Sequence, residues 1–467
     1  MIRRTFLTAT ISGVMLATLL AITGPSSSKD AYLVPRSAGV EITSILTVGD
    51  TVKKRHKGNE TYRMVGIPDG LGAYDNGDGT ITVLMNHELR AGVGIVRDHG
   101  GNGAFVSKWQ IRKSDLKVLN GEDLIQKVKL WDAPSQSYVE VPGTVFSRFC
   151  SADLAPGSAF FNAASGKGFN EGRIYMNGEE DGATGRAMAH LAEGREHGIS
   201  YEFFKMGRHS WENLLASPTP QDQTIVIGTE DGGLNKVFLY VGEKQDSGNP
   251  VEMAGLTNGT LSEIKIDGFA AEPPLGFGVG IWTPVASGGT SFLRPEDGHW
   301  DPTNPNWFYF VTTASITGNS RLWRLSFVDI AQPLLGGKIE VIIDGNLVPA
   351  PQIKMMDNIV VDGDGNVIVL EDVGGNARLG KVWKINPFTK SATMLAEHDP
   401  VLFSGPAKLT DDEEASGVIE VTGLFQGVPG YDAANNRYFL LDTQAHFGIA
   451  DPELVEGGQL MMMKVPN

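Results

Sequence analysis

The sequence predicts an all-β fold, and within that class a β-propeller of six blades with long insertions and a few short helices. Six runs of β-branched and aromatic residues recur along the 467 residues, and each ends in carboxylates or other polar groups. These runs are residues 80–88, 173–181, 224–231, 307–313, 366–372 and 437–446. The chain also contains 58 glycines and 24 prolines, which indicates many turns between short strands.

The polar endings of these runs indicate where the strands meet. A run of this kind, bounded by Gly, Asn or Asp, favours a buried strand. A carboxylate at the end of a buried strand needs water, a cation or a hydrogen-bond donor, because an unpaired buried charge is costly. Six such endings predict strands that converge on one centre, as in a propeller. The alternative is a sandwich or barrel whose six acidic turns are solvated separately.

The net charge of −16 argues against nucleic-acid binding as the main role. An acidic protein would also repel an anionic substrate, unless bound cations reverse the charge of the site. Clustered carboxylates that hold metal ions satisfy both conditions. The alternative is that the acidic surface serves solubility alone.

Residues 1–30 are predicted to be an export signal and linker, and residues 31–467 a single propeller catalytic domain. Arg3 and Arg4 precede an apolar stretch over residues 9–22, which is short for a membrane span and typical of a signal peptide. The pattern resembles a twin-arginine signal. An ordinary secretory signal and an uncleaved anchor are the alternatives. No further segment is apolar enough to cross a membrane.

The single cysteine, Cys150, rules out an intrachain disulfide. A free thiol in an oxidising compartment is a liability unless it is buried or coordinated. An arginine and an aspartate lie within three residues of it, and an acidic strand end follows. Metal ligation is therefore the first interpretation, and inert burial is the second.

The sequence also predicts the local structure of three further segments. In Arg294-Pro295-Glu296-Asp297-Gly298 the proline predicts a constrained loop, on which Arg294 either pairs locally or holds a phosphate beside metal ligands. Residues 185–194 are expected to form an amphipathic helix. Residues 460–465 are expected to form a closing strand, since propellers often close by pairing the two ends of the chain.

The sequence resembles the PhoX-type alkaline phosphatase family from about residue 40 to the C-terminus. The matching residues are Asn86-His87-Glu88, Cys150, Gly178-Glu179-Glu180, Thr229-Glu230-Asp231, Arg294 to Gly298, Asp357 to Asp372, Glu420 with Gly423, and Gln444 with His446. The most specific match is Arg-Pro-Glu-Asp-Gly followed by an aromatic strand and a threonine pair. The resemblance implies a secreted, monomeric phosphomonoesterase, periplasmic or extracellular, with a propeller fold.

The resemblance also implies iron (Fe³⁺) and calcium as cofactors, and a small phosphate ester as substrate. It implies iron ligation by Cys150 with Glu180, Glu230 and Glu296, and further iron or calcium ligation by Glu88, Glu371 and Asp372. Arg294 matches the arginine that contacts phosphate, and Arg294 and Glu296 are the expected catalytic residues.

One stretch departs from the family pattern. Members typically follow the cysteine with a glycine pair and Thr-Pro-Trp-Gly-Thr, whereas this chain has Ser151-Ala152-Asp153-Leu154-Ala155-Pro156-Gly157. Two other functions therefore stay open: a calcium-stabilised propeller that binds a partner without catalysis, and another propeller hydrolase of lactonase or phytase type.

Overall fold

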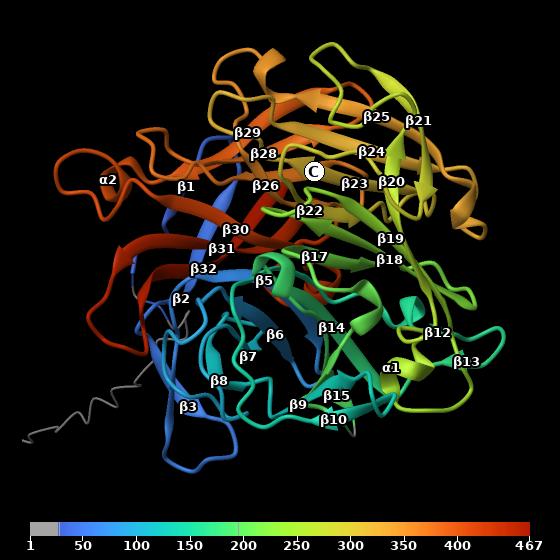
Figure 1. Ribbon diagram of the computed structural model, residues 1–467. Helices are drawn as coiled ribbons and strands as arrows, with labels where there is room; N and C mark the ends of the chain where they lie inside the picture. The colour runs from blue at the N-terminus through green and yellow to red at the C-terminus, as the bar shows by residue number, and fades with distance from the viewer. Residues whose placement is uncertain (1–26, 28, 195) are drawn as a thin grey trace, which may run out of the picture.

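Six β-sheet blades surround a central axis in the computed structural model, which describes residue 27, residues 29–194 and residues 196–467 (Figure 1). The predicted export signal lies outside these residues. The innermost strands of the blades are β5, β11, β17, β22, β26 and β30, and each contacts the next, with β30 contacting β5 again. The ring is closed, so the predicted six-bladed propeller is confirmed.

The strands of the first three blades follow from the axis outward. Blade 1 contains β5 (Pro68–Asp75), β6 (Thr80–His87), β7 (Phe105–Arg112), β8 (Val118–Asp123), β3 (Thr51–Lys54) and β4 (Thr61–Arg63). Blade 2 contains β11 (Phe149–Asp153), β14 (Gly172–Glu179), β15 (Ala187–Gly194), β16 (Ile199–Glu202), β9 (Lys127–Asp132) and β10 (Ser137–Glu140), beside a small hairpin of β12 (Phe161–Asn162) and β13 (Lys167–Gly168). Blade 3 contains β17 (Trp211–Ala216), β18 (Gln223–Glu230), β19 (Val237–Glu243) and β20 (Thr260–Ile266).

The other three blades are built in the same way. Blade 4 contains β22 (Pro295–Trp300), β23 (Trp307–Thr312), β24 (Arg321–Phe327) and β25 (Gly337–Asp344), and β21 (Val279–Val285) joins its outer edge to that of blade 3. Blade 5 contains β26 (Met356–Val361), β27 (Val367–Glu371), β28 (Lys381–Asn386), β29 (Ser391–His398) and β1 (Leu33–Pro35). Blade 6 contains β30 (Glu413–Glu420), β31 (Asn436–Gly448), β32 (Glu456–Pro466) and β2 (Glu41–Thr47).

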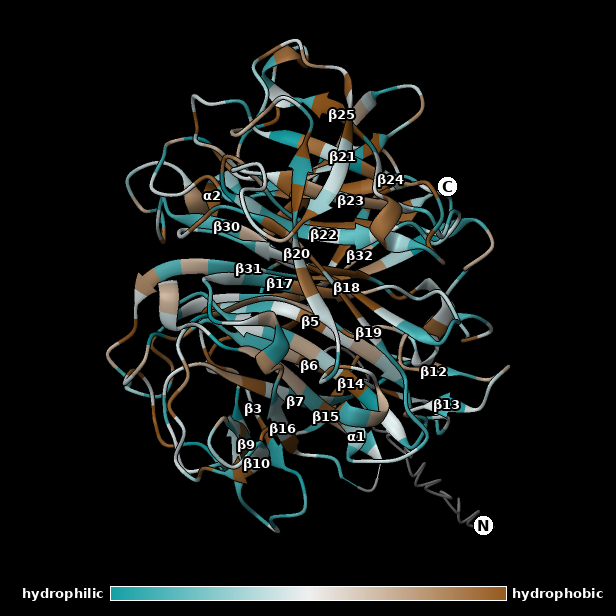
Figure 2. Ribbon diagram, turned by 45° about the vertical axis from the view of Figure 1, so that its right-hand side comes forward, coloured by the Kyte–Doolittle hydropathy of each residue, from teal (hydrophilic) through white to brown (hydrophobic). Residues whose placement is uncertain are grey.

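The hydrophobic core is divided into six main clusters, one between each pair of neighbouring blades. Leu84 of blade 1 packs with Tyr175 of blade 2, for example, while Val83 faces the opposite way and packs with Leu440 of blade 6. Each fully buried side chain of this size contributes about 1.5–3 kcal/mol. Both faces of a blade are therefore apolar, which explains why the strands read as continuous apolar runs; Figure 2 shows them in brown along β18 and β24.

The N-terminal strands close the ring against the C-terminal part of the chain. Strand β2 pairs antiparallel with β32 from Glu41–Lys464 to Thr47–Gln459, and β1 pairs with β29 of blade 5. In Figure 1 these blue strands lie beside orange and red ones. The expectation of a closing strand at residues 460–465 is confirmed.

Two local expectations were wrong. Residues 187–194 form strand β15 of blade 2 and not a helix, because the alternating apolar residues face clusters on both sides of the blade. The Arg-Pro-Glu-Asp-Gly stretch is not a loop: Pro295 begins the innermost strand β22, where its missing N–H is tolerated at a strand start. The helices are short, α1 (Pro250–Met253) and α2 (Pro400–Phe403), and within the described residues no helix has the length and apolar character of a membrane span.

Candidate metal centre

Each blade contributes the second residue of its innermost strand to one end of the central channel. These six residues, called the inner ring, are Asp69, Cys150, Glu212, Glu296, Asp357 and Glu414. All are buried except Glu414, whose exposure is intermediate. The pairing register shifts next to the ring residue in blades 1 to 5, and two residues later in blade 6. Such bulges re-aim side chains, here toward the axis.

A second set of residues surrounds the inner ring. The outer ring consists of Glu88, Glu180, Asp231, Thr313, Asp372 and His446. The first five directly follow the second strand of their blade, and His446 lies two residues before the end of β31. In every blade the backbone N–H of this residue donates to the carbonyl of the residue just before the innermost strand, at 2.9–3.1 Å. For example, Glu180 N–H donates to the Arg148 carbonyl at 2.9 Å. The six runs found in the sequence are therefore the second strands of the six blades.

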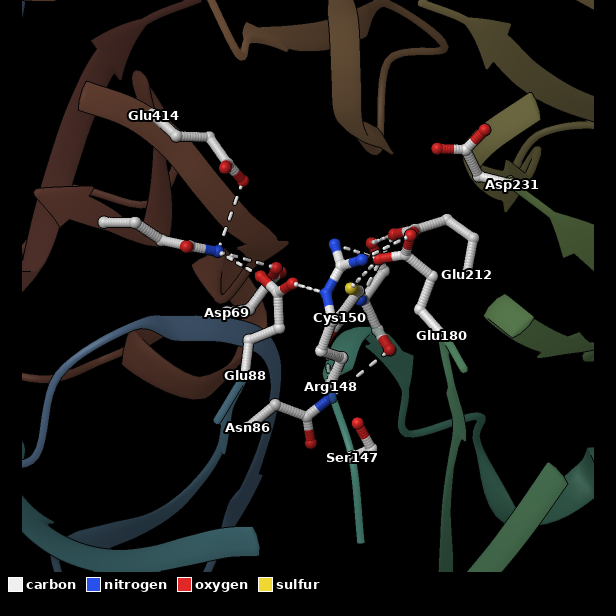
Figure 3. Close-up of polar contacts among 12 residues, drawn as sticks. Asp69, Asn86, Glu88, Ser147, Arg148, Cys150, Glu180, Glu212, Asp231 and Glu414 are labelled. Atoms are coloured by element: carbon white, nitrogen blue, oxygen red, sulfur yellow. Dashed lines mark hydrogen bonds and ion pairs between the residues drawn. The ribbon is translucent and has the colours of Figure 1, made fainter. Parts of the chain in front are cut away.

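Three groups of side chains in these rings are close enough to share cations. Their ligand atoms lie within 4.8 Å of one another in the sets Asp69–Glu88–Cys150, Cys150–Glu180–Glu212 and Glu212–Glu296–Asp357. The groups share Cys150 and Glu212, so they form one continuous series across blades 1 to 5. In Figure 3 the sulfur of Cys150 lies between the side chains of Glu88 and Glu180.

Buried amides and hydroxyls hold the ring carboxylates in place. Ser151 Oγ donates to Glu212 Oε1 at 2.7 Å, and Asn358 Nδ2 donates to Ser151 Oγ at 2.8 Å. Gln444 Nε2 donates to Asp69 Oδ2 and Glu88 Oε2, both at 3.0 Å. Partners of this kind orient metal ligands and tune their affinity.

Two arginines pair with the acidic residues of the rings. Arg148 Nε donates to Glu88 Oε1 at 2.7 Å, and its Nη1 donates to Glu180 Oε1 at 2.8 Å. Arg294 Nη2 lies 3.0 Å from both Asp231 Oδ2 and Glu296 Oε1. The two rings contain nine carboxylates, namely Asp69, Glu88, Glu180, Glu212, Asp231, Glu296, Asp357, Asp372 and Glu414. Two arginines and one histidine leave this acidic charge largely uncompensated.

The excess of acidic residues raises the pKa values of several ring carboxylates. Burial raises the pKa of Glu296 well above its ordinary value, and the carboxylates of Asp231 and Asp357 raise it further. Burial also raises the pKa of Glu212 to about 7 and, against the opposing effect of Arg148, that of Glu180 to about 8. Without cations the centre would therefore take up protons to reduce repulsion.

The residues fit a centre with bound cations. Among the described residues, the buried oxygens Asp69 Oδ1, Asp231 Oδ1 and Gln444 Oε1 have no hydrogen-bond partner, although buried polar atoms normally have one. Carboxylate and amide oxygens suit calcium, and a thiolate suits a transition metal. The donor set therefore matches hard cations along most of the series and a softer site at Cys150.

The structure brings five of the seven predicted metal ligands to this centre: Cys150, Glu88, Glu180, Glu296 and Asp372. Glu230 and Glu371 lie one residue before the outer-ring positions Asp231 and Asp372, so their side chains point away from the axis. Glu230 accepts from the Leu234 N–H at 2.8 Å. Glu371 is paired with Arg378 at 2.7 Å and accepts from Trp383 Nε1 at 3.0 Å.

Sequence reasoning missed five carboxylates of the two rings: Asp69, Glu212, Asp357, Glu414 and Asp231. The strands that carry the inner-ring residues are broken by glycine or polar residues, as in β5 with Gly70 and Gly72, so they have no clear apolar pattern. The missed signal is the acidic residue, or in blade 2 the cysteine, in the innermost strand that precedes each second strand in the sequence. The sequence analysis gave the ligand role to Glu230, whereas the structure places the adjacent Asp231 in the outer ring.

A cavity of about 640 Å³ opens beside the rings. Glu88, Arg148, Asp372, Glu414 and His446 line it together with Arg90. The rings are thus accessible to a small molecule from this side of the channel.

No family model matches the sequence, and no curated protein matches it. Among solved structures, PhoX of Pseudomonas fluorescens in complex with vanadate, a transition state analogue, has a TM-score of 0.61 and 11% identity, covering 95% of this chain and 98% of that chain. A putative 6-phosphogluconolactonase from Bacteroides uniformis has a TM-score of 0.37 and 10% identity, covering 87% and 94%. The similarity to PhoX supports the propeller fold.

Proposed function

We propose that the chain is a metal-dependent phosphatase that hydrolyses phosphate monoesters outside the cytoplasm, at a carboxylate-rich iron and calcium centre. The observation that carries this proposal is the inner ring, in which six blades place five carboxylates and one thiol at one end of the channel. The similarity in fold to a protein that binds vanadate supports it, because vanadate resembles a phosphoryl group.

The members of the three groups are proposed as metal ligands, with the outer-ring carboxylates Asp231 and Asp372 beside them. Asp69, Glu88 and Cys150 would hold a cation on one side of the centre, and Glu212, Glu296 and Asp357 on the other. Bound cations supply Lewis acidity toward phosphoryl oxygens and offset the repulsion between the protein and an anion.

Arg294 is the proposed phosphate-binding residue. A guanidinium can donate two parallel hydrogen bonds to phosphate oxygens, and 40% of the Arg294 side chain is exposed. Its ion pairs with Asp231 and Glu296 fix the fork beside the inner ring. Glu296 therefore contributes to both the metal site and the orientation of the arginine.

The test is hydrolysis of an aryl phosphate by protein matured through its own export route. We expect turnover that a strong chelator abolishes and that iron with calcium restores, and we expect Glu296→Ala to abolish it. Calcium without turnover would favour a non-catalytic propeller. Hydrolysis of lactones in place of phosphate esters would favour another propeller hydrolase.

A further inference from the structure

Arg148 and Arg294 occupy the same position in two different blades. Each is the last residue before an innermost strand, and each carbonyl accepts from the outer-ring N–H of its own blade, Glu180 at 2.9 Å and Thr313 at 3.0 Å. Both have positive φ, 47° for Arg148 and 61° for Arg294, a conformation that is uncommon outside glycine. The corresponding residues of the other blades are Ile67, Ser210, Met355 and Asp412, so blades 2 and 4 alone carry a basic side chain there.

Each of the two arginines also forms ion pairs with two neighbouring blades. Arg148 joins Glu88 of the preceding blade to Glu180 of its own blade. Arg294 joins Asp231 of the preceding blade to Glu296 of its own blade. Each guanidinium is thus fixed between two blades. Arg148 lies beside the first and second ligand groups, and Arg294 lies beside the third.

Arg148 keeps donors for a ligand. Its contacts direct Nε toward Glu88, and Nη1 and Nη2 toward Glu180. A guanidinium has five N–H groups, so each Nη retains one that has no acceptor among the described residues. The side chain is 29% exposed, and it lines the 640 Å³ cavity through which a small molecule reaches the rings. Figure 3 shows the guanidinium directed into the space between Glu88 and Glu180.

We propose that Arg148 is a second anion-binding arginine of the centre and holds phosphoryl oxygens together with Arg294. This inference rests on the proposed function. It adds a second anion-binding residue, identified because Arg148 and Arg294 occupy the same position in their blades. Two planar forks beside the ligand series would bind a tetrahedral anion from two sides, with each fork donating to different phosphoryl oxygens.

The test measures the affinity of the metal-loaded protein for inorganic phosphate by calorimetry, with metal content determined on the same samples. Arg148→Met and Arg294→Met should each weaken binding roughly 10- to 100-fold, because one charge-assisted hydrogen bond contributes about 1.5–3 kcal/mol and 1.4 kcal/mol is tenfold. Arg148→Lys keeps the charge and loses the fork, so it should recover only part of the affinity. Arg90→Met, in the same cavity but outside the repeated position, serves as the charge control, with a change below about threefold expected for a screened surface charge.

The outcomes separate this inference from the proposed function. Weakening by Arg294→Met but not by Arg148→Met would overturn the role of Arg148 and leave the proposed function intact. If neither variant weakens phosphate binding, the phosphate site itself is wrong. A gain of one metal equivalent in Arg148→Met with unchanged phosphate affinity would show that Arg148 stands in for a cation, which also overturns the inference.

Discussion

Cys150 Sγ–H donates to Glu180 Oε2 at 3.1 Å inside the ring. Burial raises the pKa of the Cys150 thiol well above its usual value, the carboxylates of Glu88, Glu212 and Glu180 raise it further, and Arg148 opposes them. The cysteine of the metal-free protein is therefore a protonated thiol, and a nucleophilic role at neutral pH is disfavoured, because the thiolate is the reactive form.

This predicts slow alkylation of the metal-free protein. At pH 8 Cys150 should react with iodoacetamide at least tenfold more slowly than a free cysteine peptide. Removing the opposing charge in Arg148→Met should slow it further. The measurement is the pH dependence of the alkylation rate by mass spectrometry. A rate near that of the free peptide would contradict this reading of the thiol.

The stability of the metal-free protein should fall as the pH rises. The pKa of Glu212 is about 7 in the folded protein and 4.5 ordinarily, so the folded state binds more protons between these values. The contribution of Glu212 to the free energy of unfolding therefore falls by about 3 kcal/mol as the pH rises from 4.5 to 7. Denaturant unfolding of chelated protein at several pH values measures the effect. Glu212→Gln should remove this part of the slope, and an unchanged slope would contradict the assignment.

Two pairs of adjacent acidic residues, Glu230 with Asp231 and Glu371 with Asp372, test which side chain of each pair faces the central axis. Asp231→Asn and Asp372→Asn should lower bound metal, because these residues face the axis. Glu230→Gln and Glu371→Gln should leave metal content unchanged; Glu371→Gln should lower stability by about 1–3 kcal/mol through its lost ion pair with Arg378. Elemental analysis of the four purified variants makes the comparison. Metal loss in the Glu variants alone would reverse the assignment.

The sequence predicted the fold through its second strands, since their apolar residues pack on both sides of each blade. It did not reveal the innermost strands, because β11, with Cys150, Ser151 and Asp153, has the composition of a loop. The five predicted ligands that the structure places at the rings, four carboxylates and one thiol, came from strand ends and the family resemblance. Glu230 was chosen instead of Asp231, and Glu371 was included together with Asp372, because the strand pattern did not show which of two adjacent acidic residues faces the axis; a one-residue shift moves a side chain to the other face of a strand.

The stretch after Cys150 that differs from the family pattern also supports the inner ring. Ser151, the first residue of the altered stretch, is fully buried and holds Glu212 through its hydroxyl. Ser151→Ala should leave the fold intact and weaken metal binding by roughly tenfold or more, the usual effect of losing a partner of a ligand. A metal titration with a competing chelator measures this. Equal affinity would mean that Glu212 is positioned by other contacts.

Gly417 tests the packing behind the ring. It has φ +32°, and a Cβ there would lie 2.6 Å from the Asp69 carbonyl oxygen and 3.2 Å from Asp442 Oδ1. Gly417→Ala should therefore destabilise the protein and displace Asp69 from the ring, lowering bound metal. Gly427→Ala is the control, because Gly427 also has positive φ but has open space around its Cβ position. Similar metal loss in both variants would attribute the effect to backbone strain alone.

The most direct test of the central claim is elemental analysis of protein matured through its own export route, alongside the double variant Glu212→Gln/Glu296→Gln. We expect the wild type to bind iron and calcium in stoichiometric amounts, with clear loss of metal in the folded double variant. Wild-type protein that carries no metal above the level of its buffer would contradict the proposed metal centre, because the two rings would then be a purely structural cluster of protonated acids.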